Sequence, residues 1–332
     1  MASLQDLRRR ISSVRNTRKI TKALELVAGA RLRRAQNRIE EMRPYADRMQ
    51  ELMIGTARAA SSFRNLALLQ ERDEVRRVAF VVVTGDRGLA GPFNGQVLRR
   101  AFELERQARG EGQEVVWLTV GRKGASTLRF RRYELTDQWA GFADKPSYSD
   151  AQAIGHNLAE LYEAEEVDRV VLLYNRYESA LVQRVTTTDL LPIREDVLAE
   201  EVDRVVLLYN RYESALVQRV TTTDLLPIRE DVLSAEEFVR GEEGPSADFI
   251  YEPEAEQILE RLLPVYLETE IYRSLLESAA AFLASQMTAM RNASKNAGEL
   301  IDTLTLQLNR ARQAEITQEI LEVVAGADAL AG

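Results

Sequence analysis

The stretch NTRKITKALELVAGARLRRAQ, residues 16–36, has an apolar or small residue at every third or fourth position. This spacing is typical of one face of a helix. The same pattern continues outward in both directions and predicts a single helix over residues 1–60, of which about 55 residues at about 1.5 Å each make a rod about 80 Å long. Pro44 predicts a kink, because proline removes a backbone hydrogen bond. The residues on the apolar face form a predicted coiled-coil seam: Leu4, Leu7, Ile11, Val14, Thr21, Leu24, Ala28, Leu32, Ala35, Ile39, Met42, Ala46, Met49 and Met53.

A similar pattern occupies the other end of the chain. No proline follows Pro264, and residues 250–332 are predicted to form a second coiled-coil helix. Two long helices at opposite ends of one chain can bury their apolar stripes against each other or against a partner, and an antiparallel pair is the simplest arrangement. The predicted stripe contains Leu275, Leu276, Leu283, Met287, Met290, Leu300, Ile301, Leu304, Leu308, Ala311, Ile316, Ile320 and Val324.

The middle of the chain, residues 75–245, follows a different period. Short β-branched runs alternate with helical patterns, which predicts a small Rossmann-like α/β domain with buried parallel strands. A further alternating run, residues 180–191, is expected to fold back as a hairpin through RYES. The predicted strands are 76–85, 114–121 and 167–175, and the predicted helices are 94–109 and 150–164. The fold class is therefore α/β, with a long antiparallel coiled coil joined to this central domain.

Composition excludes several classes of site. The chain has 332 residues, 45% of them hydrophobic, and no cysteine, so disulfides, zinc–thiolate sites and thiol catalysis are excluded. No apolar run is long enough to span a bilayer. The net charge of −8 hides an asymmetry, because residues 1–50 carry thirteen basic and five acidic side chains. A basic helix on an acidic protein favours an acidic partner, although a solvated helix face is an equally good interpretation.

Two features of the sequence are candidates for a catalytic or ligand site. TGDRGLAGPFN, residues 84–94, lies after a strand and before a helix, where α/β folds bind phosphate. Its glycines match neither common nucleotide motif, so a tight connection explains Asp86 and Arg87 better than a ligand pair does. His156 is the only histidine and is interpreted as a helix-surface residue. We therefore predict no active site, no metal and no cofactor.

Three segments together resemble the γ subunit of F-type ATP synthases: residues 16–36, residues 84–94, and NRARQAEITQEILEVVAGADAL at 309–330. They occur in the family's order, and the resemblance covers essentially the whole chain. It implies a non-catalytic rotor shaft that couples rotation of the c-ring to ATP synthesis or hydrolysis. The implied partners are the α and β subunits of the catalytic ring, the ε subunit and the c-ring, with no nucleic acid. The implied location is peripheral, at the cytoplasmic face of a bacterial membrane.

The resemblance also implies interface residues. Lys22, Arg31, Arg33 and Arg34 would meet acidic loops of the β subunits, and Arg312, Gln313 and Thr317 would form a polar catch higher on the shaft. Gln286 stands where many relatives have a basic residue. The implied partner interface is Lys22, Leu24, Arg31, Arg33, Arg34, Gln286, Arg312, Gln313 and Thr317.

Two other functions were considered. A coiled-coil nucleic-acid-binding protein would use the basic helix and bind with strong salt dependence. A nucleotide-dependent α/β enzyme would use residues 84–95. Neither explains the segment ARQAEITQEILEVV near the C-terminus.

The central domain contains a tandem repeat. The 35 residues from Ala164 to Leu198 recur without a difference from Ala199 to Leu233. Helical repeat proteins need three or more diverged units, whereas this unit is predicted to be β and occurs twice. We interpret it as a recent duplication or a sequence-assembly error without a function of its own. Both copies would compete for one place in the sheet, and the other copy would be looped out or added at an edge.

Overall fold

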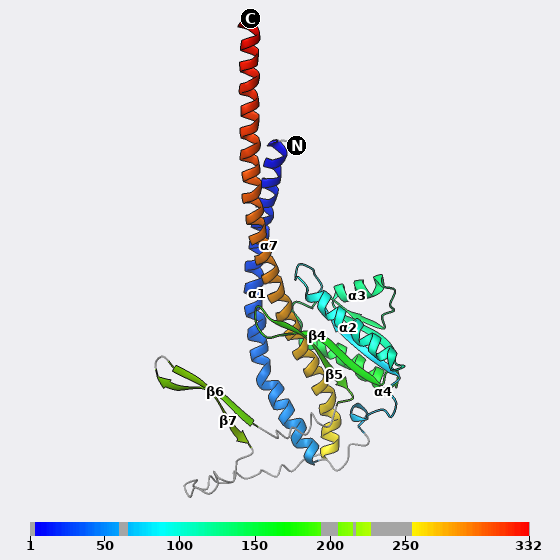
Figure 1. Cartoon of the computed structure of the whole chain (residues 1–332). Coiled ribbons are helices and arrows are strands. Elements are labelled where there is room, and N and C mark those ends of the chain that lie inside the picture. Colours follow the sequence, from blue (N-terminus) through cyan, green and yellow to red (C-terminus); the bar gives the residue numbers. More distant parts are fainter. Residues whose placement is uncertain (1–3, 60–65, 194–204, 215–216, 227–253, 332) are drawn as a thin grey trace.

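In a computed structural model, two long helices form a shaft and an α/β head lies beside the lower half of that shaft (Figure 1). The helices are α1 (Leu4–Ala59) and α7 (Ala255–Ala331). Both chain ends lie at the top of the shaft, so the two helices run antiparallel, as predicted. The structure describes residues 4–59, 66–193, 205–214, 217–226 and 254–331, so the expected domain limits at 245 and 250 lie outside the described residues.

The seam predicted for α1 packs against α7. Each of its fourteen residues is buried or half-buried, because the seam faces α7 or the head. On α7 the pattern holds from Leu275 to Ala311, with one error: Leu300 is 47% exposed and its neighbour Ile301 takes the seam position. Ile316, Ile320 and Val324 lie beyond the end of α1 and are exposed, so no described residue of this chain covers this part of the predicted stripe.

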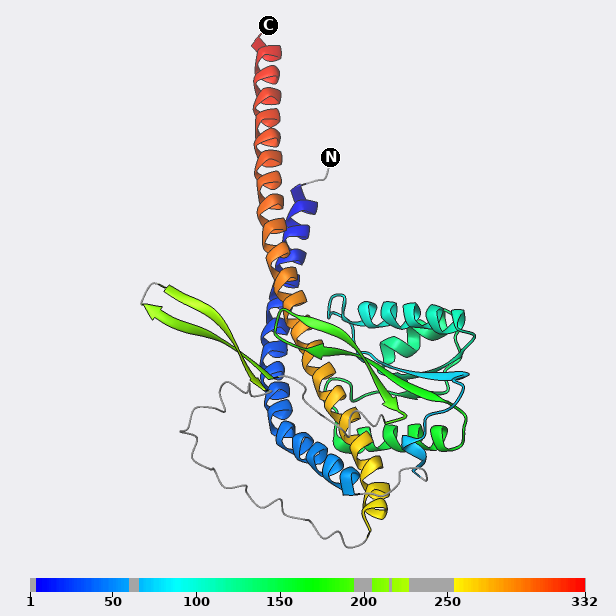
Figure 2. The same cartoon turned by 60° about the horizontal axis from the view of Figure 1, so that its bottom comes forward.

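Both shaft helices contain a proline without ending there. α1 continues through Pro44, and its lower part bends toward the base of α7 (Figure 2). α7 begins at Ala255, nine residues before the proline at which the uninterrupted pattern starts, and includes Pro264. Burial of Leu259 and Leu263 against the head explains how this first segment stays helical, since packing compensates for a lost backbone hydrogen bond.

The head is built on a five-stranded sheet of order β3-β2-β1-β4-β5. β1 to β4 are parallel, and β5 runs antiparallel to β4, so the predicted hairpin is confirmed. The sequence did not predict β3, α3 or the short helix η1. The elements are η1 (Ala67–Leu69), β1 (Arg77–Val83), α2 (Phe93–Gly110), β2 (Glu114–Val120), α3 (Arg122–Phe130), β3 (Asp137–Trp139), α4 (Tyr148–Glu163), β4 (Arg169–Tyr177) and β5 (Gln183–Leu191).

Helices cover both faces of this sheet. In β1, Ala79 and Val81 face a core shared with α4 and the lower part of α7, whereas Phe80 and Val82 face a core shared with α2 and α3. Side chains of a strand alternate between faces, so a strand buried on both sides is a continuous apolar run. Since α7 contributes Leu259 to Leu275 to the first core, the shaft is part of the head's own packing.

The two copies of the repeat occupy different places. The first copy supplies β4 and β5 of the sheet, and the second supplies β6 (Val205–Ser214) and β7 (Val217–Leu226). These form a separate two-stranded sheet that lies apart from the head (Figures 1 and 2). Their register matches the first copy: Leu172 pairs with Thr188, and Leu207 with Thr223. The expected competition therefore ends with the first copy in the sheet.

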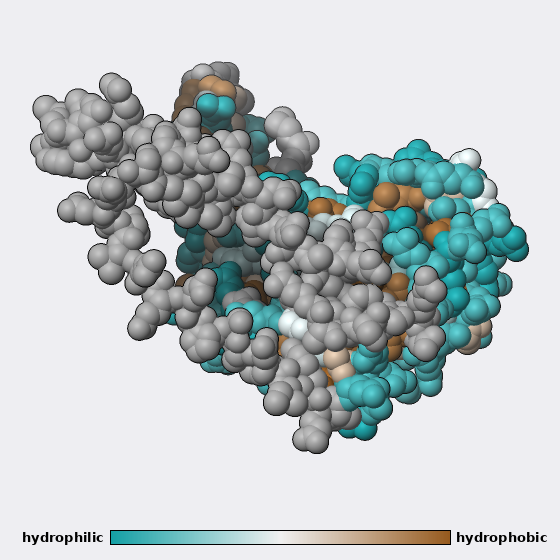
Figure 3. Space-filling view, turned by 90° about the horizontal axis from the view of Figure 1, so that it is seen from below, coloured by the Kyte–Doolittle hydropathy of each residue, from teal (hydrophilic) through white to brown (hydrophobic). Residues whose placement is uncertain are grey.

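Seen from below, the part of the head that grey atoms leave visible is mainly hydrophilic, with small apolar areas (Figure 3). Within the described residues, no helix is both long enough and apolar enough to cross a membrane.

Candidate partner-binding shaft

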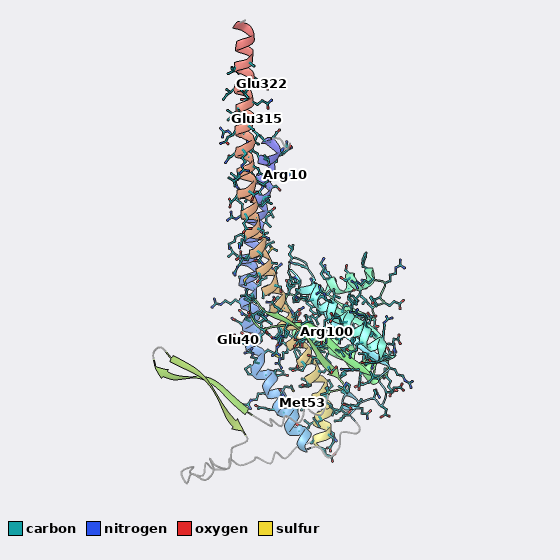
Figure 4. All side chains as sticks on the ribbon, viewed as in Figure 1. Arg10, Glu40, Met53, Arg100, Glu315 and Glu322 are labelled. Carbon is teal, nitrogen blue, oxygen red and sulfur yellow. The ribbon has the colours of Figure 1, made fainter. Side chains whose placement is uncertain are left out.

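The top of the shaft is a single helix. Leu7 and Ile11 of α1 pack on Ile301 and Leu304 of α7, and beyond Ala311 the helix has no neighbour among the described residues. Every side chain from Arg312 to Ala325 is exposed. Figure 4 shows two of these residues, Glu315 and Glu322, above the end of α1. We call residues 312–325 the upper shaft.

The upper shaft carries large apolar residues in contact with solvent. Ile316, Ile320, Leu321, Val323 and Val324 are 43–71% exposed. A sustained apolar surface of this kind on a folded protein marks a binding surface. Because apolar contact has no directional requirement, such a surface suits a partner that slides or turns around it.

The predicted polar catch lies on the same segment. Arg312, Gln313 and Thr317 are all exposed, and the Thr317 hydroxyl donates to the Gln313 carbonyl oxygen at 2.8 Å. Thr317 thus satisfies its hydroxyl within the helix, while the side chains of Arg312 and Gln313 point to solvent and are available to a partner.

A polar layer interrupts the apolar seam halfway along the coil. Thr21 Oγ1 and Ser294 Oγ lie 2.7 Å apart across the two helices. One turn further, the buried Glu25 carboxylate accepts hydrogen bonds from Lys22 Nζ at 3.0 Å and Arg291 Nε at 3.2 Å. The Lys22 hydrogen bond, together with Arg291, holds the pKa of Glu25 below its usual value. Polar pairs in a coiled coil fix the register of the helices, so this layer prevents α1 and α7 from sliding.

The basic face of α1 has mixed surroundings. Lys22 is engaged with Glu25, and Arg31 forms an ion pair with Asp144 of the head at 3.2 Å. Arg33 and Arg34 are exposed and have no ion pair within the described part of the chain. Leu24 is half-buried in the seam. The five interface residues that the resemblance implies on α1 thus divide into two with partners inside the chain, two exposed arginines without an ion pair among the described residues, and one packing residue.

A groove runs between this face of α1 and the loop before α4. Its floor is apolar, and its walls carry four basic groups and one carboxylate, so the groove is positively charged. We call it the basic groove; the residues used here are Arg31, Arg34, Arg38, Lys145, Asp144 and, in the floor, Leu276 and Leu283.

The turn at residues 84–94 contacts the chain itself. Asp86 Oδ1 accepts the backbone NH of Arg122 at 3.1 Å, and Oδ2 accepts those of Gly141 and Ala143 at 2.9 and 3.1 Å. The Asp86 carboxylate therefore joins its own turn to the start of α3 and to the loop after β3. The interpretation of this turn as a tight connection between strand and helix accounts for this geometry, because the Asp86 carboxylate binds only backbone groups of the head in these contacts.

The same turn attaches the head to α7. Phe93 and Phe282 meet edge to face with their ring centroids 5.4 Å apart. Gly85 lies so close to Phe282 that an added Cβ would be 2.7 Å from the ring, which explains glycine there. The Gly85 NH is bound by Asn94 Oδ1 at 2.8 Å. Residues 84–94 therefore form the surface on which the Phe282 ring of α7 packs.

The β4–β5 hairpin provides a second attachment. Gln36 of α1 donates to the Tyr177 hydroxyl at 2.7 Å, and Ser285 of α7 donates to Gln183 at 2.9 Å. Thr288 donates to the carbonyl oxygen of Ala180 in the hairpin turn at 3.3 Å. Gln286, half-buried, lies in this same segment of α7. The hairpin thus grips both shaft helices.

Two ionisable groups at the head–shaft contact are perturbed by burial. Burial raises the pKa of Glu277, whose carboxylate lies 3.7 Å from both Arg176 and Arg273. Tyr148 donates to Glu268 Oε2 at 2.8 Å, and burial with this hydrogen bond raises the pKa of Tyr148 to about 12. Both groups lie where the head meets the shaft, and each also lines a surface pocket: Glu277 with Arg176 and Arg273, and Tyr148 with Lys145 and Tyr272.

His156 is exposed and lies 3.1 Å from Glu160 on the same helix, in accord with the prediction of a surface residue. Among the described residues, no cluster of three or more histidines, aspartates or glutamates is arranged to hold a metal.

Sequence reasoning missed the residues that join the parts. Thr21 stood in the predicted seam as a polar member, and this was the one signal of the polar layer. Nothing in the sequence pointed to Arg291 or Phe282, because each depends on a contact between distant segments.

Comparisons with known proteins agree with one another. The family model described as ATP synthase matches residues 3–197 and 193–330, and the two ranges overlap near the end of the first copy of the repeat. The ATP synthase gamma chain of Rubrobacter xylanophilus is 43% identical over 100% of this chain and 99% of its own length. That of Acaryochloris marina is 44% identical over 99% and 100%.

Among solved structures, a chain of the Euglena gracilis mitochondrial ATP synthase (OSCP/F1/c-ring) shares the fold with a TM-score of 0.62, 18% identity, and coverage of 98% of this chain and 94% of that one. A chain from the central stalk and c-ring of the Tetrahymena thermophila enzyme gives a TM-score of 0.52, with 24% identity and coverage of 83% and 99%. The fold and the full-length sequence matches lead to one conclusion: the chain belongs to the ATP synthase gamma chain family.

Proposed function

We propose that this chain is the central rotor shaft of an F-type ATP synthase. It would couple rotation of a c-ring to ATP synthesis or hydrolysis in a ring of α and β subunits, with an ε subunit beside the head. It would catalyse no reaction itself. It would lie at the cytoplasmic face of a bacterial membrane, held there through the complex.

The observation that carries the proposal is the upper shaft. A single helix with large apolar residues exposed over about two and a half turns has no use in an isolated chain. Inside a ring of subunits, the same surface would be buried on all sides. The non-directional character of apolar contact would let it turn there.

The attachments of the head support transmission of torque. The head is held to the shaft at several separate points. These are the ring contact of Phe282, the hydrogen bonds of the β4–β5 hairpin to α1 and α7, and the apolar core shared with lower α7. A head joined in this way cannot swivel about the shaft, so a force applied to the head reaches the coil.

The basic groove and the free charges of Arg33 and Arg34 support contact with acidic loops of β subunits. We expect the double variant Arg33→Gln with Arg34→Gln to reduce ATP-driven rotation in the assembled complex and leave the thermal midpoint within about 2 °C, because exposed charges add little stability. The matched control is Arg99→Gln with Arg129→Gln, which removes two exposed arginines from the head. A large fall in thermal midpoint with normal rotation would make Arg33 and Arg34 structural residues.

The proposal itself is tested by mixing the purified chain with α and β subunits. We expect a stable complex whose ATPase activity needs all three chains. Salt-sensitive binding of nucleic acid without capture of α and β would favour the nucleic-acid-binding alternative. ATP hydrolysis by the isolated chain would favour the enzyme alternative.

A further inference from the structure

The five-stranded sheet has one position, beside β1, that two segments of this chain are equally built to fill. The first copy of the repeat fills it as β4 and β5, while the second copy forms β6 and β7 apart from the sheet. The copies agree at all 35 positions, and the free hairpin already has the strand register of the bound one. It is therefore preformed for the same position.

Each residue whose contacts hold the first copy in the sheet has an identical residue at the corresponding position of the second copy. Asp168 Oδ2 accepts the backbone NH groups of Arg76 and Arg77, both at 2.8 Å, and joins β4 to the start of β1. Asn175 donates to the carbonyl oxygen of Phe93 at 3.3 Å. The corresponding residues for Asp168, Asn175, Tyr177 and Gln183 are Asp203, Asn210, Tyr212 and Gln218.

The buried side chains are matched as well. Leu172 and Leu173 are at most 1% exposed and enter the two cores on opposite faces of the sheet. Leu207 and Leu208 stand at the same places in the second copy. The contacts made in the sheet therefore give no preference between the copies.

We propose that the second copy exchanges with the first, so that β6 and β7 occupy the position beside β1 in a minor fraction of molecules. The surface is the edge of β1 that pairs with β4, and its alternative occupant is this segment of the same chain. The exchange needs no partner and is independent of the proposed function.

The chain connections decide which copy predominates. With the first copy in place, residues 164–168 link α4 to β4, and residues 192–254 link β5 to α7. With the second copy in place, these links become residues 164–203 and 227–254. Since the cost of closing a loop grows with the logarithm of its length, the first arrangement is favoured by about sevenfold.

Hydrogen bonds at the end of α4 do not change this preference. The backbone NH groups of Glu166 and Val167 donate to the carbonyl oxygen of Leu161, at 3.0 and 3.3 Å. Because these residues follow α4 directly in the chain, the bonds can form whichever copy is in the sheet. The connection lengths therefore make the first copy the major occupant, with a second state about sevenfold less populated.

A cycle of substitutions tests the exchange. Leu172→Asp disables the first copy, Leu207→Asp disables the second, and the double variant disables both. The control is Leu172→Asp in a chain that lacks residues 199–233, which has no replacement and is expected to lose the folded head. We expect Leu207→Asp to leave the thermal midpoint unchanged, Leu172→Asp to lower it by about 5 °C with a retained cooperative transition, and the double variant to lose that transition. A head that Leu172→Asp unfolds even with the second copy intact would overturn the proposal.

Cross-linking detects the second state in the otherwise unaltered chain. The protein has no cysteine, so introduced pairs react alone. Ser285→Cys with Gln183→Cys reports the first copy in place, and Ser285→Cys with Gln218→Cys reports the second. Ser285→Cys with Arg219→Cys is the control, because neighbouring residues of a strand face opposite sides. With a short bis-maleimide, we expect near-complete linkage of the first pair, slow linkage within single chains of the second, and none of the control. Linkage of the Gln218 pair that matches the control, or that occurs only between chains, would overturn exchange within the chain.

Discussion

Glu25 and Glu277 are two buried carboxylates with opposite electrostatic environments. Glu25 lies in the coil between Lys22 and Arg291, and its pKa is lowered. Glu277 lies where α7 meets β4, and burial raises its pKa even though Arg176 and Arg273 are near. The first carboxylate therefore stabilises the fold as an anion, and the second stabilises it best when protonated.

We expect Glu25→Gln to lower the free energy of unfolding by about 1 kcal/mol at pH 7, because it removes two charge-assisted hydrogen bonds to cations that are more than half exposed. A lowered pKa gives stability that is present above about pH 4.5 and is lost as the pH falls through the folded-state value. The difference between variant and parent should therefore shrink below pH 4. Urea titrations at pH 7 and pH 3.5 measure it, with the exposed Glu40→Gln as control. A difference that grows toward low pH would contradict the assignment.

Glu277→Gln should change stability in the opposite direction to Glu25→Gln. A raised pKa gives stability that is present below the unfolded-state pKa of about 4.5 and lost as the pH rises through the folded-state value. At pH 8 the variant is spared the cost of a buried anion and should be more stable, by up to about 1 kcal/mol. At pH 4 the gain should vanish. Thermal midpoints at the two pH values test this, with Glu260→Gln as an exposed control on the same helix. A loss of stability at pH 8 would mean that the two arginines outweigh burial.

Sequence patterns predict the positions of some single residues and leave the contacts of others undetermined. Leu7 and Ile11 were assigned to the seam correctly, because helical spacing depends on near neighbours in the chain. Asp86 was placed in a tight turn, but its three backbone partners come from two later loops. Contacts of that kind are set by the folded topology, and a single sequence does not reveal them.

At the scale of elements, the upper shaft is the part of α7 that the fold of this chain does not use. Truncation after Arg310 removes residues 311–332 and retains the contacts of Leu7 and Ile11 with Ile301 and Leu304. We expect the free energy of unfolding of the isolated chain to change by less than about 0.5 kcal/mol, since the described side chains removed beyond Ala311 are exposed.

In a complex with α and β subunits, the same truncation should permit assembly and weaken torque. Single-molecule rotation against a viscous load is the measurement, with full-length chain in the same ring as the reference. Full torque from the truncated chain would show that the upper shaft is dispensable and would remove the main support for its proposed role.

The elements themselves were predictable to different degrees. The long helices follow from patterns that persist over many turns, and β1 follows from an apolar run too long to be a surface strand. β3 has three residues and α3 nine, so neither offers enough periods to be recognised. The start of α7 before Pro264 was missed because packing against the head, and not local preference, keeps that segment helical.

At the scale of the whole molecule, the antiparallel coil and the α/β head follow from one argument about apolar stripes at both chain ends. What the sequence could not decide is which copy of the repeat enters the sheet, because identical segments have identical preferences. The difference arises from the lengths of the connections, which matter only once α4 and α7 are in place. The duplicated hairpin is thus a case in which topology decides between equal local sequences.

Deletion of Ala199–Leu233 is the corresponding prediction. It joins Leu198 to Ser234 and leaves β4 and β5 with all their contacts, and it changes the net charge from −8 to −5. Because β6 and β7 lie outside the five-stranded sheet, we expect a thermal midpoint at least as high as that of the full chain and unchanged ATPase activity with α and β subunits. Solubility should also improve, since an unpaired hairpin rich in valine and leucine exposes strand edges that promote aggregation.

Limited proteolysis of the full chain supplies the second measurement. Cleavage should concentrate in the second copy, because a segment outside the packed sheet opens more readily than one within it. The first copy should be cut only at the rate of its minor displaced state. Equal protection of both copies, combined with failure of the deleted chain to fold, would mean that β6 and β7 are required by the head and that the hairpin is an integral part of the fold.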